Sequence, residues 1–136
     1  NATVAGETSS PNFPLMNAYQ AAYGGGPYDA FLTKLAPAGN ALVYSTYLGG
    51  SGEDYANGLA TDSAGSAYLS GGTTSPNFPL LKPFQPALPG TTDVFETNFN
   101  PAGSALVYSP YLGGHADTYT NAETSAQLVV DGAGGA

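Results

Sequence analysis

The feature that most constrains this chain is an internal repeat. The run SPNFPL occupies residues 10–15 and returns at residues 75–80, an offset of 65 positions. A longer run, PAGNALVYSTYLGG at residues 37–50, returns at residues 101–114 with 12 of its 14 positions identical. Self-similarity at a fixed period is typical of proteins that stack copies of one supersecondary unit.

Two copies of one unit account for the whole chain. The first copy occupies residues 1–65 and the second residues 66–136, and the second diverges at residues 115–127. The chain opens part-way through a unit and closes at the same point of the next. We therefore expect it to be a window from a longer tandem array.

Each unit is expected to contain four antiparallel strands. Alternating apolar residues and a high content of β-branched and aromatic residues indicate strands rather than helices. An Asp- and Gly-containing stretch at residues 62–66 has the composition of a hairpin turn. The expected strands are residues 56–62, 67–72, 29–35 with its copy 93–99, and 41–48 with its copy in the second unit.

A Pro-rich stretch, residues 8–27 with its copy at 73–92, is too long for a hairpin turn. Its matched apolar residues include Phe13 with Phe78. Apolar residues repeated in an irregular loop usually hold that loop on the sheet beneath, and this is the interpretation we favour. The alternative is a repeated aromatic binding patch, with Phe13 and Phe78 as ligand or interface candidates.

The unit resembles the SBBP-type β-propeller repeat of bacterial surface and secreted proteins. The most specific pieces are ALVYSTYLGG (41–50), GLATDSAGSAYLSG (58–71) and TSPNFP (74–79). The resemblance implies an all-β fold of two tandem four-stranded antiparallel blades. It also implies a large multi-blade extracellular protein with no established catalytic chemistry.

Two blades cannot close a propeller, which typically needs four to eight. Each blade buries its faces only against neighbouring blades, so two apolar faces are left to be covered. We expect one of three outcomes: neighbouring repeats in a longer chain, several chains closing a ring, or chains adding end to end as a fibre. Pairing of a strand from one subunit with a sheet of the next is a further hypothesis.

Charge excludes several partners. The chain has 2 Lys+Arg against 10 Asp+Glu and a formal net charge of −8. Binding to nucleic acid needs cationic side chains on phosphates, so we expect no nucleic-acid partner. No apolar run is long enough for a membrane-spanning helix. Only 9% of residues are charged, and the chain is rich in Thr, Ser, Asn, Gly and Tyr, so we expect an extracellular or cell-surface location.

No set of residues indicates catalysis, and we expect the protein not to be an enzyme. The single His, His115, aligns with a Ser in the first copy, and no nucleophile-elbow motif is present. The Gly-rich run at residues 23–28 precedes no helix, which predicts a flexible surface loop rather than a phosphate-binding loop.

Acidic residues give only a weak metal hypothesis. Glu53 and Asp54 adjoin a Gly-rich corner, and Asp117 is their rough counterpart in the second copy. Carboxylates and loop carbonyls suit Ca²⁺, but the spacing of an EF-hand loop is lacking. Asp62 and its counterpart Asp131 are expected to bind their own turn backbone. No cofactor is expected, with Ca²⁺ at Glu53 and Asp54 as the weak alternative.

Four tyrosines recur at matched places and are candidates for a ligand site or an interface. Exposed aromatic rings beside polar side chains can bind sugars, whereas the same rings in a strand more often pack blade against blade. Asn1 begins an Asn-Ala-Thr glycosylation pattern. The recurring tyrosines are Tyr44, Tyr47, Tyr108 and Tyr111.

From the sequence we expect a non-catalytic extracellular structural or adhesive module. It would act through protein–protein interfaces, by self-association or with neighbouring repeats, and could polymerise into surface fibres. The alternative is a lectin-like propeller that binds glycans through the repeated tyrosines.

Overall fold

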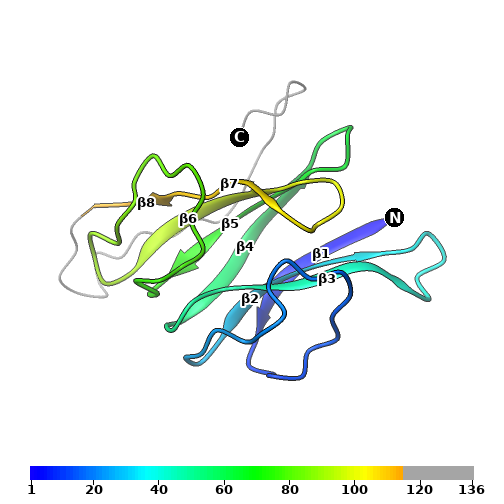
Figure 1. Cartoon of the computed structure of the whole chain (residues 1–136), viewed down its shortest axis with the longest axis horizontal. Coiled ribbons are helices and arrows are strands. Elements are labelled where there is room, and N and C mark those ends of the chain that lie inside the picture. The colour runs from blue at the N-terminus through cyan, green and yellow to red at the C-terminus, as the bar shows by residue number, and fades with distance from the viewer. Residues whose placement is uncertain (115–136) are drawn as a thin grey trace.

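The computed structural model describes residues 1–114, and all of their regular secondary structure is β-strand (Figure 1). No helix among these residues is long and apolar enough to cross a membrane. The all-β, antiparallel prediction is confirmed. The strands are β1 (Ala2–Thr8), β2 (Asp29–Leu35), β3 (Leu42–Leu48), β4 (Asp54–Thr61), β5 (Ala67–Thr73), β6 (Asp93–Phe99), β7 (Leu106–Tyr108) and β8 (Tyr111–Leu112).

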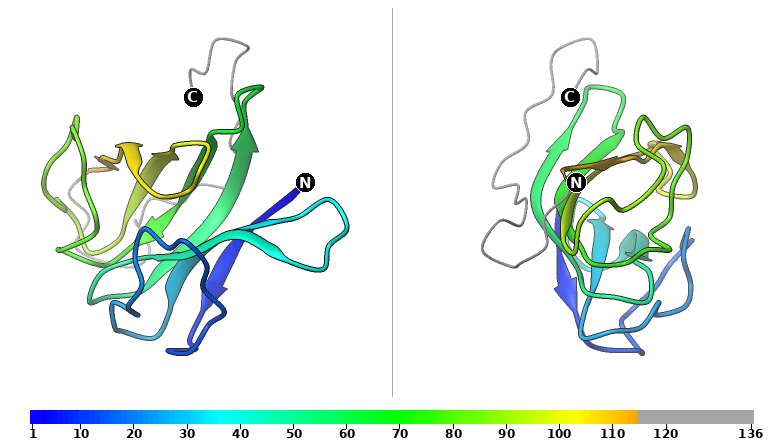
Figure 2. Two further views of the ribbon diagram at one scale, coloured as in Figure 1. Left: turned by 45° about the vertical axis from the view of Figure 1, so that its right-hand side comes forward. Right: turned by 90° about the vertical axis from the view of Figure 1, so that its left-hand side faces the viewer.

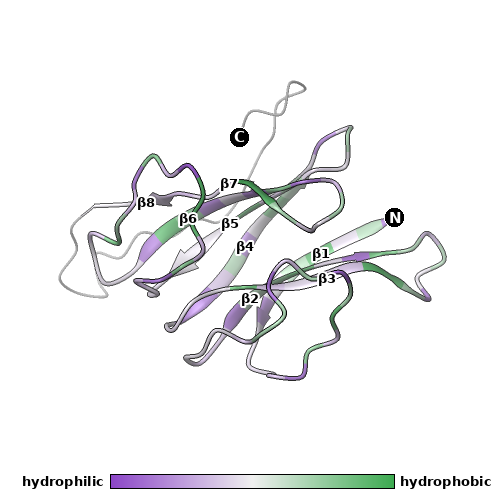
Figure 3. Ribbon diagram, viewed as in Figure 1, coloured by the Kyte–Doolittle hydropathy of each residue, from purple (hydrophilic) through white to green (hydrophobic). Residues whose placement is uncertain are grey.

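The strands form two sheets. The first sheet has the order β1-β2-β3. The second has the order β4-β5-β6-β7, and β8 also pairs with β6. Figure 2 shows them as two layers from two further directions. Alternating hydrophobic and hydrophilic segments run along the strands of both sheets (Figure 3), as expected for strands with two different faces.

The prediction of two four-stranded blades is not confirmed. β4 follows the first sheet in the chain but pairs with β5, from Asp54 opposite Thr73 to Thr61 opposite Ala67. The first sheet therefore has three strands among the described residues, and no ring of sheets closes within them. The sheet boundary lies between β3 and β4, whereas the boundary between the two copies in the sequence lies after residue 65.

The last strand of the second sheet departs from its copy. Residues 105–112 were expected to form one strand, as β3 does in the first sheet. They form β7 and β8 instead, with Ser109 and Pro110 between them. Pro110 stands where the first copy has Thr46, and proline has no N–H to donate to a sheet. The break in the strand follows from that one exchange.

The hairpin predicted at residues 62–66 is confirmed. Asp62 Oδ1 accepts hydrogen bonds from the N–H groups of Ala64 and Ser66, both at 2.9 Å. This is the backbone-binding role expected of an Asp in a turn. Its counterpart Asp131 lies outside the described residues.

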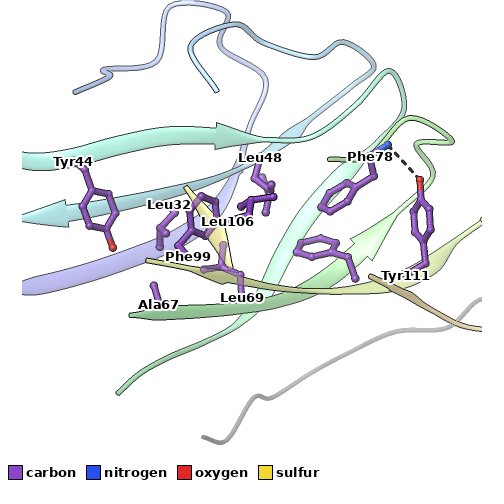
Figure 4. Close-up of a cluster of buried hydrophobic side chains, with 11 residues drawn as sticks. Leu32, Tyr44, Leu48, Ala67, Leu69, Phe78, Phe99, Leu106 and Tyr111 are labelled. Atoms are coloured by element: carbon purple, nitrogen blue, oxygen red, sulfur yellow. Dashed lines mark hydrogen bonds between the residues drawn. The ribbon is translucent and has the colours of Figure 1, made fainter. Parts of the chain in front are cut away.

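The sheets stack through two different faces. We call the face that carries Leu32, Tyr44 and Leu48 in the first sheet the front face. The face that carries Ala67, Leu69 and Phe99 in the second sheet is the back face. All six side chains are fully buried, and they meet in one apolar cluster between the sheets (Figure 4). The two sheets therefore stack front to back rather than as mirror-related faces.

A glycine in the turn between β6 and β7 makes room for the ring of Tyr44 in this contact. A Cβ on Gly103 would lie 2.4 Å from two ring carbons of Tyr44. Gly39 holds the matched position in the first copy, and nothing lies within 4 Å of its Cβ position. Both glycines have left-handed backbone, with φ of +66° and +70°.

These two glycines give a matched test of the stacking. Gly39→Ala should lower the free energy of unfolding by about 1 kcal/mol, from the left-handed backbone alone. Gly103→Ala should cost about 1–3 kcal/mol more, because the new methyl group overpacks Tyr44. Urea denaturation of both variants measures the difference, and equal losses would contradict the stacked arrangement.

Candidate functional site

A buried carboxylate lies where β4 begins. Asp54 is fully buried, and its Oδ1 accepts a hydrogen bond from Thr73 Oγ1 at 2.5 Å. Its Oδ2 accepts hydrogen bonds from Gly50 N at 2.8 Å and Ser75 Oγ at 2.7 Å. Burial raises the pKa of Asp54, and the bonds from Thr73, Gly50 and Ser75 oppose that rise. The carboxylate thus joins the start of β4 to the end of β5.

The corner formed by residues 49–53 is held by the residues that follow β5. Gly52 N donates to Ser75 Oγ at 2.8 Å, and Glu53 N donates to Thr74 Oγ1 at 2.7 Å. Ser51 N donates to Asn77 Oδ1 at 2.8 Å. Every one of these acceptors is a short side chain of residues 74–77, so this run recognises the corner through its backbone.

A second buried carboxylate lies beside the first. Asp29 is fully buried, and its Oδ2 accepts a hydrogen bond from Gly24 N at 2.6 Å. Its Oδ1 has no hydrogen-bond partner among the described residues. Gly49 separates the two acids, because a Cβ there would lie 2.8 Å from Asp29 Oδ1 and from Asp54 Oδ2. Only a glycine fits between these carboxylates.

The pKa of Asp29 is raised to about 6. Burial is the main cause, and the neighbouring charge of Asp54 adds to it. The hydrogen bond from Gly24 opposes the shift. The two acids are close together, and both are fully buried.

The Gly-rich run at residues 23–28 packs against the corner. The Cβ positions of Gly24 and Gly26 lie 2.4 Å and 2.1 Å from the carbonyl oxygens of Gly50 and Gly52. Side chains at these glycines would therefore collide with the backbone. The prediction of a surface loop did not foresee this contact, which places Gly24 N on Asp29.

Glu53 and Asp54 are the weak Ca²⁺ candidates. No group of three or more His, Cys, Asp or Glu side chains within residues 1–114 could hold a metal ion. Asp54 gives both oxygens to hydrogen-bond donors, so it acts as a structural acceptor here. Asp117 and His115 lie outside the described residues.

Tyr47 and Tyr111 hold the Pro-rich loops on their sheets. Tyr47 Oη donates to Ser10 O at 2.7 Å and accepts from Phe13 N at 3.0 Å. Tyr111 Oη makes the matched bonds, to Ser75 O at 2.7 Å and from Phe78 N at 3.3 Å. This confirms the interpretation that the repeated loops are anchored on the sheets.

Phe13 and Phe78 belong to these same loops. The ring of Phe13 is 4.6 Å from that of Phe31, and the ring of Phe78 is 4.5 Å from that of Phe95, measured between centroids. Both phenylalanines therefore pack on the strand beneath them.

The other two candidate tyrosines differ in their surroundings. Tyr44 is fully buried between the sheets. Tyr108, its copy, is half-buried and donates a hydrogen bond to Glu96 Oε1 at 2.8 Å. Burial and the Glu96 carboxylate together raise the pKa of Tyr108. Asn1, the glycosylation candidate, is exposed.

The family model of the SBBP repeat, described as a beta-propeller repeat, matches residues 43–79. The chain carries an SBBP β-propeller repeat. No curated protein matches the chain. The matched segment begins in β3, passes through the corner and both strands of the β4–β5 hairpin, and ends in the loop after β5. It therefore contains Asp54 together with the residues that hold its carboxylate.

The predicted site residues do not include the hydroxyl partners of Asp54. Thr73 and Ser75 are repeated as Thr8 and Ser10, and Asp29 is repeated as Asp93. Polar residues kept at matched positions between apolar strands were the available signal. Taken singly, each of these residues is of a type that is common in turns and loops.

Removing the Asp54 carboxylate should destabilise the SBBP repeat strongly. Asp54→Ala leaves three buried donors without an acceptor, and we expect a loss of about 3 kcal/mol or more in the free energy of unfolding. The matched control is Glu53→Ala, which should change it by less than about 0.5 kcal/mol. Similar small losses in both variants would contradict the structural role of Asp54.

Asp29 should make stability depend on pH. An acid whose pKa is raised in the folded state binds its proton more tightly there, so stability falls as the pH rises from about 4 through about 6. Asp29→Asn should therefore gain about 1–2 kcal/mol relative to the unsubstituted chain between pH 4 and pH 7.5. Denaturation curves at both pH values measure this gain, and parallel pH profiles would contradict it.

Proposed function

We propose that this chain is a non-catalytic structural module of an extracellular or cell-surface protein. It works by stacking with further sheets of the same type, in neighbouring repeats or in other copies of the chain. Support for the location comes from the low content of charged residues, 9%, and from the SBBP repeat. Support for the stacking comes from matched residues in the two copies.

The observation that carries the proposal is a contrast in burial on both faces. On the front face, Leu48 is fully buried against the second sheet, whereas its copy Leu112 is 55% exposed. On the back face, Leu69 is fully buried, whereas its copy Val4 is 44% exposed. In each pair, the residue that faces the other sheet is buried. Its copy, which faces no sheet among the described residues, is exposed.

Aromatic residues of the loops repeat this contrast. Tyr19 contacts Phe99 of the second sheet edge-on, with ring centroids 5.8 Å apart. Its copy Phe84 is 87% exposed. A ring this exposed would gain favourable contact if another sheet offered it an apolar partner.

Front-to-back stacking can continue, because any stack of sheets keeps one free front face at one end and one free back face at the other. Such a heterologous contact builds a ring if the rotation closes and a fibre if it does not. Repeated contacts of this kind between chains would give the protein a fibre-forming or adhesive role. The glycan-binding alternative has less support, because Tyr44, Tyr47 and Tyr111 are fully buried.

One amino-acid difference between the two copies is expected to weaken stacking of a further sheet on the front face of the second sheet. Glu96 stands at the front-face position that Leu32 occupies in the first sheet. Burial raises the pKa of Glu96, and a stacked sheet would bury it further. Association should therefore be stronger at acidic pH, where this carboxyl is neutral.

Exchanges on the front face test the proposal. Glu96→Leu should strengthen self-association about tenfold at neutral pH, because it restores the residue of the first sheet and removes a buried charge. Leu112→Asp should weaken self-association by a similar factor. Sedimentation velocity over a concentration series measures both.

The matched control is Val107→Asp. Val107 and its copy Val43 are exposed to nearly the same extent, 41% and 40%, so this position lies outside the stacking contact. The control should leave association unchanged. If Glu96→Leu and Leu112→Asp also left it unchanged, the stacking proposal would be wrong.

A further inference from the structure

The edge of β1 that does not pair with β2 corresponds to the edge of β5 that pairs with β4 in the second sheet. We propose that β1, which ends at Thr8, forms a socket for a strand of another SBBP repeat together with Ser10 and Asn12 of the loop that follows. The incoming strand would be preceded by a corner of the form Gly-Gly-x-Gly-x-Asp, and its Asp would bind the two hydroxyl groups. This inference rests on the proposed function and names the partner's chemistry.

The template for the socket is the pairing of β4 with β5. There Asp54 pairs with Thr73, and its carboxylate accepts hydrogen bonds from Thr73 and Ser75. Asn77 accepts the N–H of Ser51 from the same corner. Thr73 and Ser75 are fully buried as a result.

The socket in the first sheet has the same framework but no strand in it. Among the described residues, β1 pairs with β2 alone. Thr8, the copy of Thr73, is half-buried, and Ser10, the copy of Ser75, is exposed. Neither hydroxyl group donates a hydrogen bond within residues 1–114.

The framework is held in place without the incoming strand. Ser10 N donates to Thr8 Oγ1 at 3.1 Å, as Ser75 N donates to Thr73 Oγ1 at 2.9 Å. Tyr47 anchors the carbonyl of Ser10 just as Tyr111 anchors that of Ser75. Since these bonds lie within the first sheet and its loop, the socket is preorganised, which reduces the entropic cost of binding.

One difference defines the partner further. In the second sheet the ring of Tyr55 lies over Gly72, where a Cβ would be 2.3 Å from the Tyr55 hydroxyl oxygen. The copy of Gly72 in β1 is Glu7, which is exposed. A large ring opposite Glu7 would meet a side chain, whereas a cation there would meet a carboxylate. The fitting strand therefore has a small or cationic residue directly after its Asp.

A peptide tests the socket. The probe has the sequence of residues 47–62 with the change Tyr55→Lys and carries a fluorescent label for anisotropy measurements with the whole chain. We expect saturable binding. The same peptide with the additional change Asp54→Ala should bind about tenfold or more weakly, because the carboxylate supplies the buried hydrogen bonds.

Variants of the chain locate the binding. The double change Thr8→Val and Ser10→Ala should weaken binding about tenfold, whereas Thr3→Val, on the same strand away from the corner, should leave it unchanged. If the double variant bound the probe as well as the unsubstituted chain, the peptide would be displacing β4 or binding elsewhere. That result, or no binding at all, would overturn the socket.

The variant Leu112→Asp separates this inference from the stacking proposal. Its substitution lies on the second sheet, so it should bind the probe normally even when it no longer self-associates. Loss of probe binding in Leu112→Asp would overturn the assignment of the socket to β1. Normal self-association of the unsubstituted chain without probe binding would overturn the socket alone.

Discussion

The architecture depends on the hydrogen-bonded burial of the Asp54 carboxylate. An unpaired carboxylate inside a protein is costly, and Asp54 is tolerated because a backbone N–H and two hydroxyl groups donate to it. These donors come from two sides: Gly50 lies in the corner at residues 49–53, whereas Thr73 ends β5 and Ser75 follows it. The bonds from Thr73 and Ser75 to this carboxylate hold β4 beside β5 in the second sheet, although β4 directly follows the first sheet in the chain.

Because β4 belongs to the second sheet, the two sequence repeats form two sheets that stack on each other. The polypeptide passes from one sheet to the next at the corner, and its next strand opens the new sheet. The first sheet then packs its front face on the back face of the second, around Leu32, Tyr44, Leu69 and Phe99. Because the contact joins two different faces, further sheets can repeat it, and apolar positions are left exposed at both ends of the described part.

Much of the fold could be predicted from the sequence, because the strands carry clear alternation. The strands at residues 29–35 and 93–99 have their expected bounds, and the turn at Asp62 forms as its composition indicates. The anchoring of the Pro-rich loops was also foreseen. These features depend on neighbours close in the chain or on residues visibly repeated.

The rest depends on contacts that no local pattern records. Asp29 and Asp54 lie close together only because the loops at residues 23–28 and 49–53 pack backbone against backbone through glycines. The break at Pro110 and the charge at Glu96 are single exchanges within near-identical copies. Their effects appear only when each copy is placed in its own sheet.

The most direct measurement of front-to-back stacking is cross-linking between single-cysteine variants, since the chain has no cysteine of its own. Val4→Cys places a thiol on the back face of the first sheet, and Leu112→Cys places one on the front face of the second. With a short bifunctional thiol reagent, a mixture of the two variants should give cross-linked dimers, whereas either variant alone should stay monomeric. Dimers from either variant alone in the same yield, or none from the mixture, would contradict the account.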